Sequence, residues 1–225
     1  MTMRIVCLVT GYIFGLFQTS YILGKMHGID IRDYGSGNAG TTNMLRTMGT
    51  RAGLITFFGD VLKTIAAVLV CLAIFYRSDV NPEMLQLIKI YASAGAILGH
   101  NFPFYLGFRG GKGIACTAGW IITMDPYMVL IGLIVFFGIF FTTHYVSLGS
   151  IVLYITFLIE VIIMGALRLG TFRNITTPVA IECAIVTALL CGMAIYRHRE
   201  NIVRLIQHNE KKTYLTKKSG DQEGK

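Results

Sequence analysis

Charged side chains are scarce in this sequence: Asp, Glu, Lys and Arg make up only 14% of its 225 residues, whereas 54% are hydrophobic. A soluble domain carries about a quarter charged residues, so this shortage excludes a water-soluble globule. Intrinsic disorder is excluded as well, because the chain has 14 Phe, 11 Tyr and long aliphatic runs, which collapse or enter a bilayer. The composition predicts a single all-α, polytopic integral membrane protein.

Metal-binding and disulfide patterns are absent too. The five cysteines stand at positions 7, 71, 116, 183 and 191, with no CxxC pair and no histidine at ligand spacing. Four of them lie inside apolar runs, where cysteine acts as a small hydrophobic residue. We therefore expect no disulfide framework, no metal site and no cofactor.

Basic residues outnumber acidic ones, 20 to 12. In a soluble protein this excess would suggest a nucleic-acid partner, but in a membrane protein it indicates the positive-inside bias of cytoplasmic loops. Such loops also suit anionic lipid headgroups and phosphorylated substrates. We expect membrane lipids as neighbours and no nucleic acid.

Seven apolar segments are predicted to be transmembrane helices, covering residues 5–23, 53–76, 84–100, 113–124, 127–143, 148–167 and 178–197. The fourth is short, because twelve residues rise only about 18 Å against a hydrocarbon core of about 30 Å, so it either spans or forms a re-entrant hairpin. If it spans, the segments on the inner side hold 14 of the 20 Lys and Arg residues. The positive-inside rule therefore favours seven spans, with the N-terminus periplasmic and the C-terminus cytoplasmic. Residues 1–200 would form the membrane domain, and residues 201–225 a cytoplasmic tail that contributes to the site.

The first polar segment, residues 34–46, is rich in glycine. Its glycines at 35, 37 and 40 match the dinucleotide pattern GxGxxG, but they follow a membrane helix instead of a strand, which argues against a Rossmann fold. A backbone nest for an anion, with Ser36, Asn38 and Asn43 as donors and Arg46 as a positive charge, is the alternative to a plain turn before the next helix.

The second polar segment, residues 99–113, places Gly110, Gly111 and Gly113 around Lys112. Close backbone approach and an ammonium group suit a phosphate, although the spacing is not that of a Walker A loop. The positive dipole end of helix 113–124 would face the same anion. His100, in the same segment, has either a structural or a catalytic role.

Two further polar segments follow the fifth and seventh predicted helices: residues 143–148, with Ser147, and residues 197–210, with Asn201 and Glu210. The latter is alternatively an interfacial amphipathic helix on anionic lipid. With the predicted topology, all four polar segments lie on the cytoplasmic side and form a site for a phosphorylated substrate. A small organic-phosphate transporter and a non-catalytic scaffold are the rival interpretations. Transporters usually bind near the bilayer midplane.

The polar segments resemble the signatures of the PlsY family, the bacterial acyl-phosphate:glycerol-3-phosphate acyltransferases. Residues 35–46 match the first signature with Thr41 for the usual Ala, and residues 99–115 match the second, followed by Cys116 for Thr. Residues 146–148 and 199–205 match two shorter patterns, and Asp60 and Lys63 match the family's Asp-x-x-Lys. The resemblance runs from about residue 10 to residue 212.

The resemblance implies an enzyme of the bacterial inner membrane that transfers a fatty acyl group from acyl phosphate to the 1-hydroxyl of glycerol 3-phosphate. The products are lysophosphatidic acid and inorganic phosphate, in the first acylation of phospholipid biosynthesis. No histidine is followed at the fifth position by Asp, so the His-x4-Asp motif of other glycerolipid acyltransferases is absent. We expect a monomer that receives acyl phosphate from the enzyme that makes it.

The resemblance also assigns the site residues. The expected catalytic residues are Ser36, Arg46, His100 and Lys112. The expected substrate-binding residues are Gly37, Asn38, Gly40, Asn43, Gly110, Gly111, Gly113, Ser147, Asn201 and Glu210. The base that removes the hydroxyl proton is either His100 or an oxygen of the acyl phosphate itself.

Overall fold

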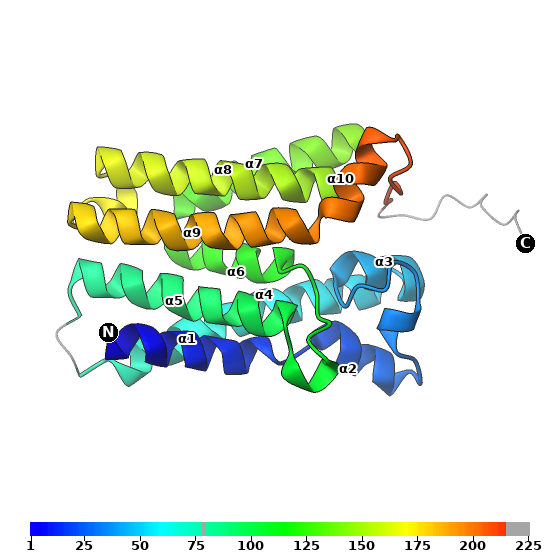
Figure 1. Cartoon of the computed structure of the whole chain (residues 1–225), viewed down its shortest axis with the longest axis horizontal. Coiled ribbons are helices and arrows are strands. Elements are labelled where there is room, and N and C mark those ends of the chain that lie inside the picture. Colours follow the sequence, from blue (N-terminus) through cyan, green and yellow to red (C-terminus); the bar gives the residue numbers. More distant parts are fainter. Residues whose placement is uncertain (78–79, 215–225) are drawn as a thin grey trace, which may run out of the picture.

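The computed structural model describes residues 1–77 and 80–214, and this part of the chain contains no β-strand. Its helices run roughly parallel to one long axis (Figure 1). The α-helices are α1 (Thr2–Gly15), α2 (Thr19–Met26), α3 (Thr41–Met48), α4 (Thr50–Ile74), α5 (Pro82–Asn101), α6 (Ile114–Met124), α7 (Pro126–Thr143), α8 (Val146–Leu167), α9 (Thr177–Arg197) and α10 (Arg199–Ile206). Short 3-10 turns lie at η1 (Ile31–Asp33), η2 (Phe104–Leu106) and η3 (Gly170–Phe172).

The prediction of one continuous helix over residues 5–23 is wrong, because the chain breaks between α1 and α2. At the break the side chain of Gln18 donates to the carbonyl of His100 at 2.9 Å. The carbonyl of Phe17 accepts from Lys63 Nζ at 2.7 Å. The bond from Lys63 satisfies a backbone carbonyl that the break leaves without a helical partner, and the bond from Gln18 ties the break to α5.

The other six predicted helices correspond to α4–α9, with each boundary within three residues of the prediction. Two of them start at proline, with Asn81 before Pro82 and Asp125 before Pro126 accepting backbone hydrogen bonds as N-caps. Proline is well tolerated at the first helical position because its missing N–H would be unpaired there.

Glycine permits α1 and α5 to pack backbone to backbone. A Cβ at Gly11 would lie 2.1 Å from the carbonyl oxygen of Ala92, and a Cβ at Gly99 would lie 2.2 Å from that of Tyr12. Gly15 and Gly95 are equally constrained, so each helix carries two glycines four residues apart. This small-residue interface is typical of membrane helices, and it fixes α5, which carries His100 at its end.

The main apolar core surrounds the short helix α6. Trp120 is completely buried and packs edge-to-face on Phe157 of α8, with ring centroids 4.7 Å apart. Gly119 allows α6 to approach α4, because a Cβ there would lie 2.5 Å from the Val61 carbonyl oxygen. α6 is therefore an internal helix that aligns the loop before it.

Within the described residues, five helical segments are long and apolar enough to cross a membrane: Thr2–Met26, which includes the break, Thr50–Ile74, Pro126–Thr143, Val146–Leu167 and Thr177–Arg197. The 11-residue α6 is too short by this measure. The 20 residues of α5 include Glu83, Lys89 and His100, which reduce its hydropathy. The chain is thus a multi-pass, helical membrane protein, and length and composition alone identify five of the seven predicted spans.

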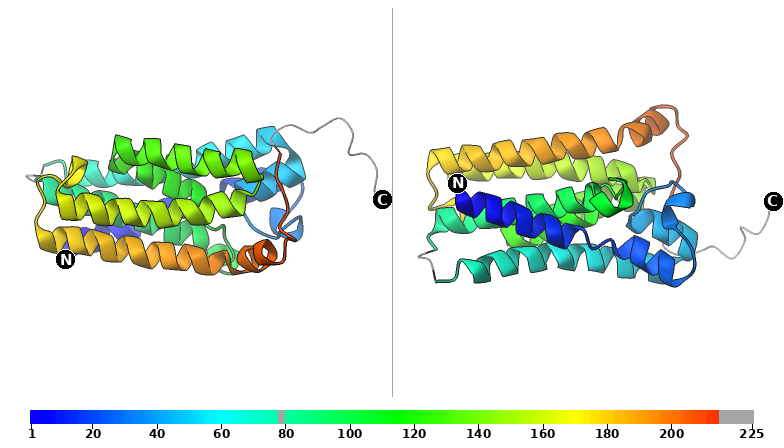
Figure 2. Two further views of the ribbon diagram at one scale, coloured as in Figure 1. Left: turned by 90° about the horizontal axis from the view of Figure 1, so that it is seen from above. Right: turned by 60° about the horizontal axis from the view of Figure 1, so that its bottom comes forward.

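The polar segments gather at one end of the bundle. Figure 1 and the two views of Figure 2 show α2, α3 and α10 together at this end, with the N-terminus at the other. The loop that precedes α6 and the turn between α7 and α8 reach the same end, since hydrogen bonds join them to residues 199–214, which we call the C-terminal segment. We call this the polar end.

Candidate active site

The first polar segment is folded by Asn43. Its Oδ1 accepts the backbone N–H of Ser36 at 2.9 Å, and its Nδ2 donates to the carbonyls of Ile31 and Tyr34 at 3.0 and 2.9 Å. Gly35 and Gly37 have φ of +64° and +67°, which glycine adopts without strain. Asn43 thus holds the loop, whereas the exposed Ser36 and half-buried Asn38 remain at its surface.

The second polar segment packs directly on the first. The N–H of Gly111 donates to the carbonyl of His100 at 3.1 Å, and the N–H of Gly110 donates to that of Asn101 at 3.2 Å. A Cβ at Gly111 would lie 2.0 Å from His100 Nε2 and 2.8 Å from the Ala39 carbonyl oxygen. The two glycine-rich loops therefore meet over the His100 ring, at a distance that only glycine allows.

Lys112 joins this loop to the C-terminal segment. Its Nζ donates to Asn201 Oδ1, and Asn201 Nδ2 donates to Glu210 Oε1 at 2.9 Å. Arg204 Nε donates to the other Glu210 oxygen, also at 2.9 Å. Burial, followed by the nearby Arg204, lowers the pKa of Lys112 to about 8. This series of hydrogen bonds connects two polar segments that the sequence predicted to be neighbours.

Arg46 and Ser147 bring in the remaining segments. Arg46 Nη2 donates to Thr213 Oγ1 at 2.7 Å and to the Lys211 carbonyl at 2.8 Å. The N–H of Thr213 donates to the carbonyl of His144 at 2.9 Å. Ser147 is buried in the first turn of α8, close in sequence to His144, and its hydroxyl has no hydrogen-bond partner in the described part of the chain. No sequence signal indicated Thr213.

A buried polar cluster lies beneath the two glycine-rich loops. Lys63 Nζ is 2.8 Å from Asp60 Oδ1 and 2.9 Å from His100 Nδ1. Asp60 also accepts from Thr19 Oγ1 at 3.1 Å. The Asp60–Lys63 pair was foreseeable from its helical spacing, but its contact with His100 was not. An ammonium that donates to Nδ1 leaves the proton of neutral His100 on Nε2, the atom that faces Gly111.

Asp60, His100 and Cys116 each offer one ligand atom within 4.8 Å of the others, as a metal site would require. The residues fit a metal poorly, because Asp60 and His100 are already bound by the ammonium of Lys63. A cation would have to displace this ammonium.

The chain matches the family model described as glycerol-3-phosphate acyltransferase over residues 5–208. That range includes the break between α1 and α2, both glycine-rich loops and α10. The chain belongs to the glycerol-3-phosphate acyltransferase family. The resemblance seen in its motifs is thereby confirmed, and so is the prediction of an acyltransferase in phospholipid biosynthesis.

Relatives within the family match nearly the whole chain. A glycerol-3-phosphate acyltransferase of Clostridioides difficile is 39% identical over 214 residues, covering 92% of this chain and 94% of the relative. One from Bacillus cytotoxicus is 38% identical over 212 residues, covering 94% and 96%.

The fold is similar to the crystal structure of PlsY, an integral membrane glycerol 3-phosphate acyltransferase, in its glycerol 3-phosphate form. The TM-score is 0.75 at 30% sequence identity, covering 94% of this chain and 96% of PlsY. The lysophosphatidic acid form of PlsY gives a TM-score of 0.73 at 29% identity. The acyltransferase therefore shares an integral membrane fold with an enzyme solved with substrate and with product.

Proposed function

We propose that this enzyme transfers a fatty acyl group from acyl phosphate to the 1-hydroxyl of glycerol 3-phosphate, giving lysophosphatidic acid and inorganic phosphate. The observation that carries the proposal is the position of Lys112. It stands in a glycine-rich loop packed against a second one, and Asn201 links it to the C-terminal segment. Two phosphorylated substrates need such a pair of adjacent anion sites.

The acyl phosphate would bind between the two glycine-rich loops. Their backbone N–H groups form an anion nest, and Lys112 supplies the charge that offsets the phosphate. The residues assigned to this phosphate are Ser36, Gly37, Asn38, Gly40, Gly110, Gly111, Lys112 and Gly113. Asn43 supports them by holding the first loop in shape.

Glycerol 3-phosphate would bind on the side of the C-terminal segment. Arg46, Ser147 and Asn201 are the assigned residues, and Glu210 orients Asn201. Ser147 offers a buried hydroxyl without a partner, which a polar ligand would satisfy. Arg46 offers a guanidinium suited to phosphate.

In the proposed reaction, the 1-hydroxyl oxygen attacks the acyl carbonyl carbon, and the bond from that carbon to the phosphate oxygen breaks. The hydroxyl proton passes to an oxygen of the departing phosphate. His100 is disfavoured as the base, because Lys63 occupies its Nδ1 and its Nε2 lies against Gly111. His100 acts instead as a positioning residue beneath the loop, and alignment with charge neutralisation supplies the rate.

We further propose that α5 and α6 complete seven spans in the bacterial inner membrane, with the polar end in the cytoplasm. The basic residues support this orientation, since α10 and the residues after it are rich in Arg and Lys. Residues 1–200 form the membrane domain in this proposal. The tail contributes Asn201 and Glu210, and its last eleven residues, 215–225, lie outside the described part of the chain.

The test uses the purified chain in lipid vesicles with glycerol 3-phosphate, offered palmitoyl phosphate or palmitoyl-CoA. Release of phosphate together with lysophosphatidic acid, from the acyl phosphate alone, is the expected result. Turnover of the CoA thioester would overturn the donor assignment. Uptake of glycerol 3-phosphate into the vesicles without acylation would favour the transporter.

A further inference from the structure

Tyr154, in the first half of α8, reaches the loop that carries Lys112 from inside the bundle. We call residues 110–113 the lysine loop. The side chain of Tyr154 is buried and packs with Cys191 and Ala194 of α9. Ile114, the first residue of α6, contacts the same cluster. Close packing on neighbouring helices fixes the ring, and therefore fixes where its hydroxyl group stands.

The hydroxyl group of Tyr154 takes part in two hydrogen bonds. Thr117 Oγ1 donates to it at 3.0 Å, and it donates to the carbonyl of Lys112 at 3.4 Å. The second bond is long for a hydroxyl donor. The proton of a buried hydroxyl group nevertheless needs an acceptor, and Thr117 is the donor in the other bond. The position of Tyr154 therefore sets the direction of the Lys112 carbonyl.

The Lys112 carbonyl belongs to the same peptide unit as the N–H of Gly113. The described chain has no cis peptide bond, and in a planar trans peptide these two groups point in opposite directions. The N–H of Gly113 therefore points away from Tyr154, and no group in the described residues accepts it. An N–H group attracts an anion, whereas the partial negative charge of a carbonyl oxygen repels it. Tyr154 thus keeps the repelling group turned away and leaves the attracting group available.

A second carbonyl of the lysine loop is also held by a side chain. Arg197, at the end of α9, donates from Nη2 to the carbonyl of Gly110 at 3.1 Å. Its guanidinium lies over the ring of Phe102, 5.1 Å from the centroid. Arg197 is charged, so removing it would change the electrostatic potential at the site as well as the loop. Tyr154 is the better residue for testing orientation alone.

We propose that Tyr154 is a positioning residue of the acyl phosphate site, whose hydroxyl group orients the peptide between Lys112 and Gly113 so that the Gly113 N–H faces the phosphate. The inference rests on the proposed function, which assigns that phosphate to the lysine loop. Thr117 acts through Tyr154, because its donated bond leaves the phenol proton for the Lys112 carbonyl. The hydroxyl group itself touches neither substrate.

The first test is Tyr154→Phe, which removes the hydroxyl group and keeps the ring. The variant and the unmodified chain are assayed in vesicles with palmitoyl phosphate and glycerol 3-phosphate. We expect kcat/KM for palmitoyl phosphate to fall about tenfold, as for a slightly misplaced contact, and the KM for glycerol 3-phosphate to stay unchanged. Lower stability alone would reduce the amount of active enzyme without weakening the binding of one substrate.

Binding of inorganic phosphate is measured separately, as the rise in unfolding temperature that added phosphate produces in detergent. We expect a smaller rise in Tyr154→Phe than in the unmodified chain, because one N–H group of the anion site is no longer oriented. This measurement does not depend on turnover. The unfolding temperature without phosphate shows in the same experiment that the variant is folded.

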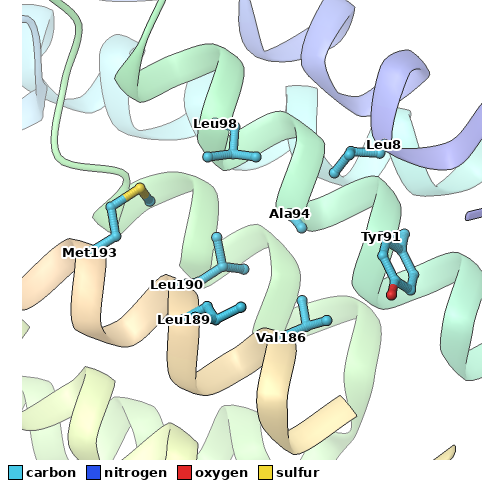
Figure 3. A pocket seen from close by; sticks show the side chains of 8 residues that line it. All are labelled: Leu8, Tyr91, Ala94, Leu98, Val186, Leu189, Leu190 and Met193. Atoms are coloured by element: carbon cyan, nitrogen blue, oxygen red, sulfur yellow. The ribbon is translucent and has the colours of Figure 1, made fainter. Parts of the chain in front are cut away.

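Tyr91→Phe is the matched control. Tyr91 is half-buried in α5, and its hydroxyl group donates to Glu182 Oε1 at 2.7 Å. Figure 3 shows it at an apolar pocket between α5 and α9. Glu182 also binds Arg4, near the N-terminus, which lies at the end of the bundle opposite the lysine loop (Figure 1). The control should lose some stability and keep both the kinetic constants and the effect of phosphate.

The second test asks whether Thr117 acts through Tyr154. Thr117→Val removes the donated hydrogen bond, and Thr117→Ser keeps it. We expect Thr117→Val to lower kcat/KM for palmitoyl phosphate about threefold and Thr117→Ser to be near normal. The double variant Tyr154→Phe/Thr117→Val should lose no more than Tyr154→Phe alone, because the two side chains act in series.

Unchanged kinetics and an unchanged phosphate effect in Tyr154→Phe would overturn the inference, and so would an equal weakening of both substrates. Independent losses in the double variant would contradict the route from Thr117 through Tyr154. A failure of the proposed function would appear in the unmodified chain, as absent turnover of palmitoyl phosphate. The phosphate measurement would still compare the two chains in that case, so the two proposals fail separately.

Discussion

Two lysine-centred clusters lie within the same bundle, and they differ in how many N–H donors of the ammonium group already have an acceptor. Lys63 is buried, with its Nζ within hydrogen-bond distance of Asp60, His100 and the Phe17 carbonyl. Lys112 is half-buried and contacts Asn201 as its one hydrogen-bond acceptor in the described residues. An ammonium has three donors. All three donors of Lys63 therefore have partners within the protein, whereas two donors of Lys112 are available to a ligand.

The comparison separates the residues that hold the polar end together from those that we propose to bind the substrates. The Lys63 cluster connects the break between α1 and α2, the middle of α4 and the His100 ring, all beneath the loops. The Lys112 cluster is built from a loop and the C-terminal segment, which a substrate can reach. Substitutions in the first cluster should reduce stability, and those in the second should reduce turnover.

Lys112→Ala should have the largest effect on turnover. Removing the charge proposed to face the departing phosphate should lower kcat/KM about 10³-fold, the size typical of a lost transition-state contact. Lys112→Arg should lose less, because it keeps the charge. Steady-state phosphate release from palmitoyl phosphate measures both, and near-normal activity of the Ala variant would remove Lys112 from the site.

Lys63→Met should lower the stability of the bundle and leave the hydrogen bonds of Lys112 at the polar end in place. It leaves the Asp60 carboxylate buried without its cation, a change that costs about 3–5 kcal/mol. The double variant Asp60→Asn/Lys63→Met should recover part of this loss. Thermal unfolding in detergent measures the stability, and a double variant less stable than the single one would contradict the pairing.

Gly111→Ala should disturb the contact between the two loops. The added methyl group would collide with the His100 ring, so the loop must shift, and we expect about a hundredfold loss of kcat/KM. Gly138→Ala is the matched control, because a Cβ there would meet nothing within 4 Å. Equal activity of the two variants would show that the close approach is dispensable.

The pH dependence of the KM for acyl phosphate should report the charge of Lys112. With its pKa lowered to about 8 by burial, Lys112 is charged below that pH and loses its proton as the pH rises through it. The KM for acyl phosphate should therefore rise about fivefold between pH 8 and pH 9, because the charged fraction falls from about one half to about one tenth. In Lys112→Arg this rise should vanish, and a persistent rise would assign it to another group.

Thr213→Val should have the smallest effect. It removes the hydroxyl that accepts from Arg46 but keeps the side chain's shape, so Arg46 becomes less well oriented. We expect the KM for glycerol 3-phosphate to rise about threefold, as for loss of a partly exposed hydrogen bond, with kcat unchanged. A fall in kcat of similar size would place Thr213 closer to the reacting atoms.

The sequence predicted six helices closely because proline and long apolar runs mark their ends. It missed the break at Gln18 because the hydrogen bonds that stabilise it come from His100 and Lys63, far away in the chain. Likewise, Arg4 and Tyr91 donate to Glu182 from two other helices, α1 and α5, so no spacing along the sequence indicates these contacts.

The site itself was predicted as a set of segments, and their contacts were not. Glycine spacing indicated two phosphate loops, yet only the three-dimensional arrangement shows that Asn43 is used to hold one of them. The same holds for His100, whose Nδ1 is occupied by Lys63. Roles that depend on which atom is already bonded are not encoded in local spacing.

The C-terminal segment has a consequence for the order of synthesis. Glu210 and Thr213 contact Asn201, Arg46 and His144, and they follow the last membrane helix along the chain. Chains fold progressively from the N-terminus as they are made. The bundle can thus be inserted before residues 210–213 emerge, and the contacts of these residues at the polar end form last. In a nascent chain that ends before residue 210, Asn201 and Arg46 therefore lack these hydrogen-bond partners.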